Sequence, residues 1–143
     1  RIAVAKIRFG TDGWRARIAE EYTFDNVRRV AQGFAEYLKQ NGLADRGVVV
    51  GYDRRFASND FAAAAAEVMA GNGIGVWLTH RYCPTPIVSY TIKERGAGGA
   101  INITASHNPP TDNGFKVRDA DGAAIAPEAL PRLRAISLRL VRM

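Results

Sequence analysis

The 143-residue sequence is poor in residues that would cross-link the chain or hold it in a membrane. A single cysteine, Cys83, excludes an internal disulfide. No stretch has the uninterrupted apolar length of a membrane-spanning helix, and the opening residues RIAVAKIRFG lack the apolar run and cleavage site of a secretion signal. We therefore expect a soluble cytoplasmic protein without a membrane partner.

Dense basic runs with interleaved aromatic residues are also absent, although 20 lysines and arginines face 14 acidic residues. The positive charges are scattered, with pairs such as Arg28 with Arg29 and Arg54 with Arg55. A nucleic-acid platform needs concentrated charge and residues that stack on bases. The net charge of +6 therefore favours a small anionic ligand over nucleic acid.

The signatures of several common site types are missing as well. There is no Walker-type phosphate loop, and GNGIG at 71–75 precedes a predicted strand, whereas a dinucleotide fingerprint follows one. Ser106 lacks the flanking glycines of a serine hydrolase elbow. His80 and Cys83 provide too few ligands for a zinc site. These absences argue against nucleotide binding, acyl transfer and structural zinc.

Apolar residues make up 47% of the chain, which is enough for one domain with a core. Periodicity predicts a helix at 24–40, with Thr23 as its N-cap and Gly42 at its end, and a second helix at 58–73 capped by Ser58 or Asn59. The remaining expected elements are strands at 2–9, 47–53, 74–80, 100–106 and 114–122, a turn at 10–15, and helices at 87–99 and 126–143. This alternation predicts an α/β fold, a single-domain three-layer α/β/α sandwich with a mixed, mostly parallel sheet.

The segment TASHNPPTDNGFK at 104–116 concentrates reactive side chains directly after a predicted buried strand. Ser106 could act as a nucleophile, with His107 or Lys116 as a local base or cation, and Arg15 could help to stabilise a phosphoryl group. Serine and asparagine before proline are also ordinary turn residues. The spacing alone therefore favours a purely structural turn, with a nucleophilic serine as the alternative.

Three motifs together resemble a known family. FGTDGWR at 9–15, GYDRR at 51–55 and TASHNPPTDNGFK at 104–116 are similar, in order and spacing, to the first domain of the α-D-phosphohexomutases, over about residues 6–128. This family includes phosphoglucomutase, phosphomannomutase and phosphoglucosamine mutase. The resemblance implies that Ser106 carries the phosphate moved between C1 and C6 of a hexose phosphate. It also implies acid–base or charge-stabilising roles for His107 and Lys116 and a substrate-facing Arg15.

The same resemblance implies Mg²⁺, with a phosphoserine oxygen of Ser106 as one ligand, and a hexose bisphosphate as activator. The aspartates of the metal site and the sugar-selecting loop lie in later domains of the family, which are not present in this sequence. We therefore expect residues 1–143 to be the first domain of a larger enzyme and to be inactive alone, with 129–143 as a linker helix or a divergent tail.

Some alternatives stay open at this stage. Asp53, Arg55 and Asn108 are expected to support the loop, with a carboxylate–guanidinium bond between the first two, and direct substrate contact is the alternative. Trp14 and Ala16 favour a phosphoglucomutase or phosphomannomutase over an enzyme for glucosamine phosphate. The competing function is a non-catalytic phosphosugar-binding or interaction module with the same fold.

Overall fold

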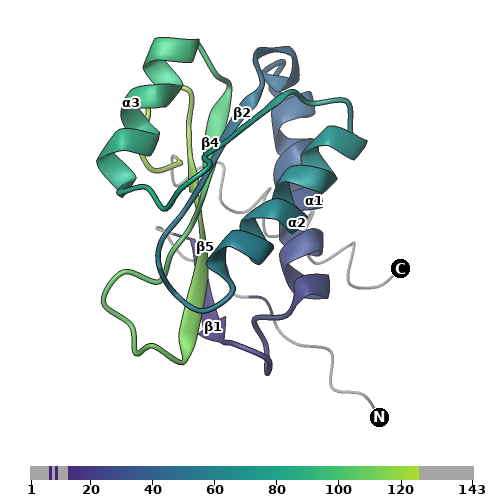
Figure 1. Ribbon diagram of the computed structural model, residues 1–143. Helices are drawn as coiled ribbons and strands as arrows, with labels where there is room; N and C mark the ends of the chain where they lie inside the picture. Colours follow the sequence, from purple (N-terminus) through teal and green to yellow (C-terminus); the bar gives the residue numbers. More distant parts are fainter. Residues whose placement is uncertain (1–6, 8, 10–12, 126–143) are drawn as a thin grey trace.

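The computed structural model describes residues 7, 9 and 13–125, which form one sheet with helices on both faces (Figure 1). The strands and helices are β1 (Trp14–Arg17), α1 (Phe24–Gln40), β2 (Val48–Tyr52), α2 (Ser58–Gly71), β3 (Val76–Leu78), α3 (Thr85–Arg95), β4 (Gly99–Ile103) and β5 (Asp112–Arg118). A short 3₁₀ turn at Ala44–Arg46 precedes β2.

The five strands are arranged in the order β1-β5-β4-β2-β3. β2 pairs in parallel with both β3 and β4, whereas β5 pairs antiparallel with both β4 and β1. The sheet is therefore mixed, as expected, with its parallel half on one side and its antiparallel half on the other. Because β2 and β4 are parallel neighbours, the segments that follow them emerge at the same edge of the sheet.

The helices cover the two faces unequally (Figure 1). α1 and α2 bury the main core on one face, where Val27, Phe34 and Leu38 meet Ile101 and Phe115. α3 covers the other face through Val88 and Ile92, which pack against Val49 and Ala100. The three-layer α/β/α sandwich is thus confirmed. None of the described helices is long and apolar enough to cross a membrane.

The N-cap expected for α1 is present, because the Thr23 hydroxyl accepts a hydrogen bond from the amide of Asn26. The expected cap of α2 is wrong. Ala57 is the N-cap residue, with a φ of 57°, and Ser58 is the first helical residue. α3 begins at Thr85, earlier than expected, since a proline at the second position of a helix displaces no intrahelical hydrogen bond.

β1 lies in a segment that was expected to be a turn. Gly13 has a φ of 111°, and a Cβ at this position would lie 2.2 Å from the carbonyl oxygen of Phe115. The glycine therefore permits a close approach to β5, after which Trp14 pairs with Phe115. The opening strand expected at 2–9 and the helix expected at 126–143 fall mainly or wholly outside the described residues.

Tyr22 connects the main core to β5. Its ring is fully buried, stacked on Trp14 at 4.7 Å and edge-on to Phe61 at 4.8 Å, and its hydroxyl donates to the Gly114 carbonyl at 2.8 Å. Burial raises the pKa of Tyr22 well above 10.0, and the charge of Asp53 adds to this shift.

We predict that Tyr22→Phe lowers the free energy of unfolding by about 1 kcal/mol near neutral pH, because one buried hydrogen bond is lost. The raised pKa means that the folded state holds the phenolic proton more tightly. Its stabilising effect is therefore present below pH 10 and is lost as the pH rises above 10. Urea unfolding from pH 7 to 11 should show a shallower alkaline loss in the variant than in wild type. Tyr90→Phe, at a position 66% exposed, is the control and should match wild type.

Candidate active site

Arg55 joins the segment after β2 to the loop at 104–111 between β4 and β5, called here the Ser106 loop. Its guanidinium donates to the carbonyl oxygens of Ser106 (2.9 Å), Asn108 (2.7 Å), Pro109 (2.6 Å) and Asp112 (3.0 Å). Its Nε lies 3.4 Å from Asp53 Oδ2, so the ion pair expected from the sequence is present. Arginine has five N–H donors, and these five oxygens engage all of them.

Asp53 is held in turn by a buried polar network. Its Oδ1 accepts hydrogen bonds from the Arg55 amide at 2.9 Å and the Ser58 hydroxyl at 2.8 Å. Asn113, which is fully buried, donates to the Ser58 hydroxyl at 2.9 Å and accepts from the Gly114 amide at 2.8 Å. The network therefore ties the end of β2 and the start of α2 to β5, and it fixes the carboxylate that orients Arg55.

Ser106 is exposed in the loop that Arg55 holds, and its backbone adopts a φ of 55°. Its amide donates to Thr104 Oγ1 at 3.2 Å, and its carbonyl accepts from Arg55. Among the described residues, nothing hydrogen-bonds its hydroxyl. The backbone of Ser106 is thus held on both sides in a left-handed conformation, while its side chain remains accessible for chemistry.

Asn108 links the Ser106 loop to β1. Its side-chain oxygen accepts a hydrogen bond from Arg15 at 3.3 Å, and its amide group donates to Asp112 at 3.1 Å. The Asn108 backbone amide also closes a turn by donating to the Ala105 carbonyl at 3.1 Å. Arg15 is therefore brought to the Ser106 loop, although it is 91 positions earlier in the sequence than Ser106.

Lys116 lies within β5, where a strand was expected at 114–122, and only 6% of it is exposed. The register pairs it with Asn102 of β4 and pairs Gly114 with Arg15 of β1. Because side chains alternate along a strand, Lys116 and Arg15 are on the same face of the sheet, opposite to the main core. His107 is exposed, and among the described residues it forms no hydrogen bond or ion pair. The hydrogen bonds of Arg55, Asp53 and Asn108 therefore do not extend to the His107 side chain.

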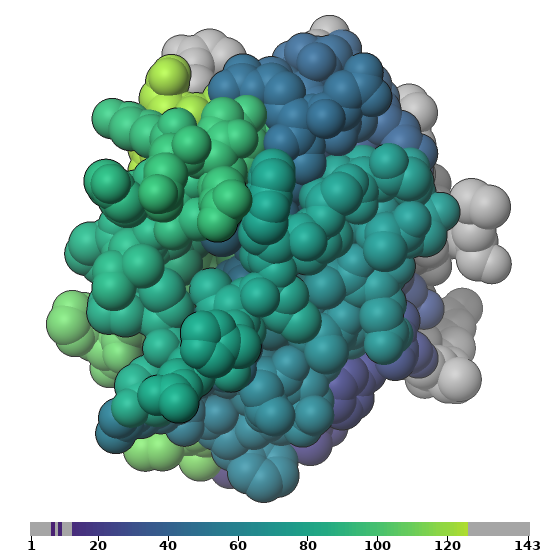
Figure 2. Space-filling view, turned by 45° about the horizontal axis from the view of Figure 1, so that its top comes forward, coloured from purple at the N-terminus to yellow at the C-terminus, as the bar shows by residue number. Residues whose placement is uncertain are grey.

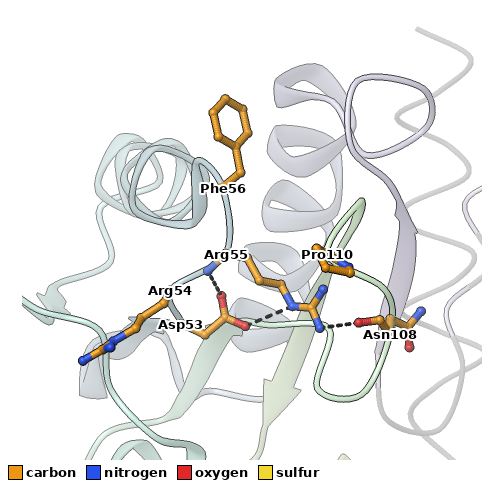
Figure 3. Close-up of a pocket in the computed structure, with 6 residues that line it drawn as sticks. All are labelled: Asp53, Arg54, Arg55, Phe56, Asn108 and Pro110. Atoms are coloured by element: carbon orange, nitrogen blue, oxygen red, sulfur yellow. Dashed lines mark hydrogen bonds and ion pairs between the residues drawn. The ribbon is translucent and has the colours of Figure 1, made fainter.

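A cavity of about 460 Å³ lies beside the Ser106 loop. Figure 3 shows Arg55 pointing from the segment after β2 toward Asn108 and Pro110, with Asp53 beside it and Phe56 directed away. Arg54 points in the opposite direction. Both arginines line the cavity, but of the two only Arg55 donates hydrogen bonds to the loop.

Residues 6–140 match the family described as phosphoglucomutase/phosphomannomutase, alpha/beta/alpha domain I. The chain belongs to this family. It is 41% identical to the "Probable phosphoribomutase" of Schizosaccharomyces pombe over 85% of the chain, and 45% identical to the phosphoglucosamine mutase of Synechococcus elongatus over 82% of the chain. The crystal structure of a "putative phosphomannomutase" from Thermus thermophilus covers 93% of the chain with a TM-score of 0.87 and 41% identity.

The chain spans only part of these relatives. It covers 22% of the Schizosaccharomyces protein, 25% of the Synechococcus protein and 30% of the Thermus chain. The matching family describes a first domain, and the mixed sheet with helices on both faces agrees with that description. The resemblance inferred from the three sequence motifs is therefore confirmed at the level of the family and the domain.

The magnesium ion implied by the phosphohexomutase resemblance needs several hard oxygen ligands. Within residues 7, 9 and 13–125 there is no group of three or more His, Cys, Asp or Glu side chains placed to hold a metal. Near the Ser106 loop, Asp53 is engaged by Arg55 and Ser58, and Asp112 accepts from Asn108. The described residues alone therefore do not form a magnesium site.

The sequence analysis missed Tyr22, Asn113 and the supporting role of Ser58 in this phosphohexomutase domain. Tyr22 contacts Gly114 across 92 positions, and Asn113 contacts Ser58 across 55. No local pattern marks such residues, because each is defined by a partner on a distant element. Ser58 was noticed only as a possible helix cap, and its hydroxyl is used instead to support Asp53.

We predict that Arg55→Lys destabilises the domain by roughly 2 kcal/mol or more, because a lysine has three donors and no planar fork to reach five oxygens. Urea unfolding should report this loss, and amide hydrogen exchange should speed up in residues 104–113. Arg95→Lys makes the same exchange at an exposed helix end and should leave both unchanged. Equal stability of the two variants would show that Arg55 does not hold the loop.

We also predict that Ser106→Gly is more stable than Ser106→Ala by about 1 kcal/mol, because alanine must adopt the left-handed conformation that glycine reaches without a Cβ penalty. The two variants remove the same hydroxyl, so their difference isolates the backbone. Thermal and urea unfolding of both measure it. Alanine equal to or more stable than glycine would contradict a strained serine.

Proposed function

We propose that this chain is the phosphate-carrying domain of a phosphosugar mutase, with Ser106 as the carrier. The proposed reaction moves phosphate between the C1 and C6 oxygens of a hexose phosphate through a bisphosphorylated intermediate. The observation that carries the proposal is the accessible Ser106 hydroxyl on a backbone that Arg55 and Thr104 hold in a left-handed conformation. An ordinary surface turn has no need for four hydrogen bonds from one guanidinium group.

The proposed chemistry has two matched halves. In the first, a free hydroxyl of the sugar monophosphate attacks the phosphorus, the bond to Ser106 Oγ breaks, the sugar hydroxyl loses a proton, and Ser106 Oγ takes one up. In the second, the reoriented bisphosphate returns its other phosphoryl group to Ser106, whose hydroxyl is deprotonated as the new P–O bond forms, while the sugar O–P bond breaks and that sugar oxygen takes up a proton. Each half exchanges one P–O bond for another, so no oxidant and no net water is required.

Cations around Ser106 would stabilise the group in transit. A phosphoserine bears nearly two negative charges, and the transferring phosphoryl group spreads charge over its oxygens. Arg15 reaches the loop through Asn108, and Lys116 is on the same face of the sheet as Arg15. We assign both to charge stabilisation or proton transfer, with Arg15 facing substrate. His107, exposed next to the carrier, is the further acid–base candidate.

Magnesium and the activator belong to the same proposal. Phosphorylated Ser106 would offer one oxygen to Mg²⁺, and the other ligands would come from parts of the parent protein beyond this sequence. A hexose bisphosphate would phosphorylate the resting serine. Because the chain spans 22% to 30% of the relatives it matches, we expect residues 1–143 alone to have essentially no mutase activity.

The substrate is proposed to be a glucose or mannose phosphate, with glucosamine phosphate as the alternative. Relatives of similar identity are named for ribose, glucosamine, glucose and mannose phosphates. Such different names on chains that share this domain imply that it handles the phosphate and that the sugar is selected elsewhere.

We predict that Ser106→Ala abolishes mutase activity in the full-length parent, because no second hydroxyl in the loop has the same position. The parent would be incubated with glucose 1,6-bisphosphate and analysed by intact mass and peptide mapping, then assayed with glucose 1-phosphate and magnesium. Wild type should gain one phosphate on Ser106 and the variant none. Thr111→Ala, in the same loop, should retain both phosphorylation and turnover.

Activity of Ser106→Ala near the wild-type rate would refute the carrier assignment. A parent protein that binds glucose 1-phosphate but is neither phosphorylated nor active would favour the non-catalytic module instead. Turnover by residues 1–143 alone, on the order of 10 per second, would show that the other domains are not needed.

A further inference from the structure

A second cavity, of about 390 Å³, lies on the other side of the segment that follows β2. It is formed between that segment and the one that follows β3, and its lining includes Arg54, Asn59, His80, Arg81 and Tyr82. In Figure 2 the blue atoms after β2 lie against teal atoms after β3 at the lower left of the molecule. Neither Ser106 nor any other residue of its loop lines this cavity.

The wall of this cavity carries an excess of positive charge. Its one carboxylate, Asp53, is already neutralised by Arg55 and hydrogen-bonded by Ser58. Arg55 has no donor left, because all five point toward the Ser106 loop and Asp53. Among the described residues, Arg54 and Arg81 have no acidic partner. Two guanidinium charges therefore face this cavity without a counter-charge.

One of these two guanidinium groups is already held in place. The Arg54 carbon Cζ lies 3.8 Å from the centroid of the Tyr82 ring, and its Nη2 donates to the Tyr82 hydroxyl. Stacking on the ring leaves the edge of the guanidinium available for further hydrogen bonds. Because the Arg54 side chain is already ordered, anion binding there would cost little additional side-chain entropy. Arg81 and His80, on the adjoining segment, also line the cavity and are exposed.

We infer that this cavity is a second anion site, built for a small phosphate monoester. Two arginines match the oxygens of a tetrahedral dianion, and the exposed side chains of Asn59 and His80 add neutral or cationic donors. The volume lies within the usual range for small-molecule sites and exceeds what inorganic phosphate would fill, which leaves room for an organic group. Asp53, Arg54 and Arg55 line both cavities, but residues of the Ser106 loop line only the first, and residues 80–82 line only the second.

The test is a titration of the ¹⁵N-labelled 143-residue chain with inorganic phosphate and with glucose 6-phosphate at constant ionic strength. Amide shifts of residues 80–82 and Asn59 report on the cavity, and those of residues 106–108 report on the Ser106 loop. Arg54→Gln and Arg81→Gln each remove one charge from the cavity. Arg95→Gln removes one charge at the exposed end of α3 and is the matched control.

We expect glucose 6-phosphate to shift residues 80–82 and to bind at least as tightly as phosphate. Each cavity variant should weaken binding about tenfold or more, the usual effect of one charge-assisted hydrogen bond. Arg95→Gln should bind like wild type. Absence of shifts at 80–82, equal weakening by Arg95→Gln, or binding of phosphate with exclusion of the ester would each overturn the inference. Shifts confined to 106–108 would reject this site and leave the carrier role of Ser106 untouched.

Discussion

The arrangement of the site depends on one guanidinium group. The Ser106 loop turns between two antiparallel strands, and four backbone carbonyl oxygens from this loop and the first residue of β5 converge on a single point. Carbonyl groups that converge in this way repel one another and need a multivalent donor, which Arg55 supplies. Asp53 fixes the direction of that donor, and Ser58 and Asn113 fix Asp53. The loop therefore takes its shape from the end of β2 and the start of α2.

This constraint explains how an unfavourable backbone can persist at the proposed carrier. A left-handed serine costs about 1 kcal/mol or more, and isolated turns would relax it. Here the neighbouring peptide groups are held by Thr104 and Arg55, so the serine cannot relax without breaking those bonds. Among the described residues, no hydrogen bond to the Ser106 hydroxyl helps to hold the loop. Structural and chemical tasks are thus divided between the backbone and the hydroxyl of the same residue.

Local patterns in the sequence were sufficient for the elements that depend on local forces. The 24–40 helix, its Thr23 cap and the strands around Val50 and Ile101 follow from periodicity and capping. Contacts across long sequence separations were not predictable in this way. β1 exists because Gly13 lets it approach β5, and Lys116 is buried because β5 continues past the loop. Three short motifs, each an unbroken run of residues, identified the family. They did not reveal the roles of Tyr22 or Asn113, whose partners are distant in sequence.

The pair Arg54 and Arg55 shows why a net charge does not locate an anion site. The two residues are adjacent, and each adds one positive charge to the sequence. In the structure, Arg55 directs its donors to carbonyl oxygens and the Asp53 carboxylate. Arg54 stacks on Tyr82 and keeps donors available for a ligand. A basic residue attracts a ligand strongly only when its charge is not already paired with acidic or carbonyl groups of the protein. The charge available for binding must therefore be counted residue by residue, and Arg54 and Arg81 carry such charge where the segments after β2 and β3 meet.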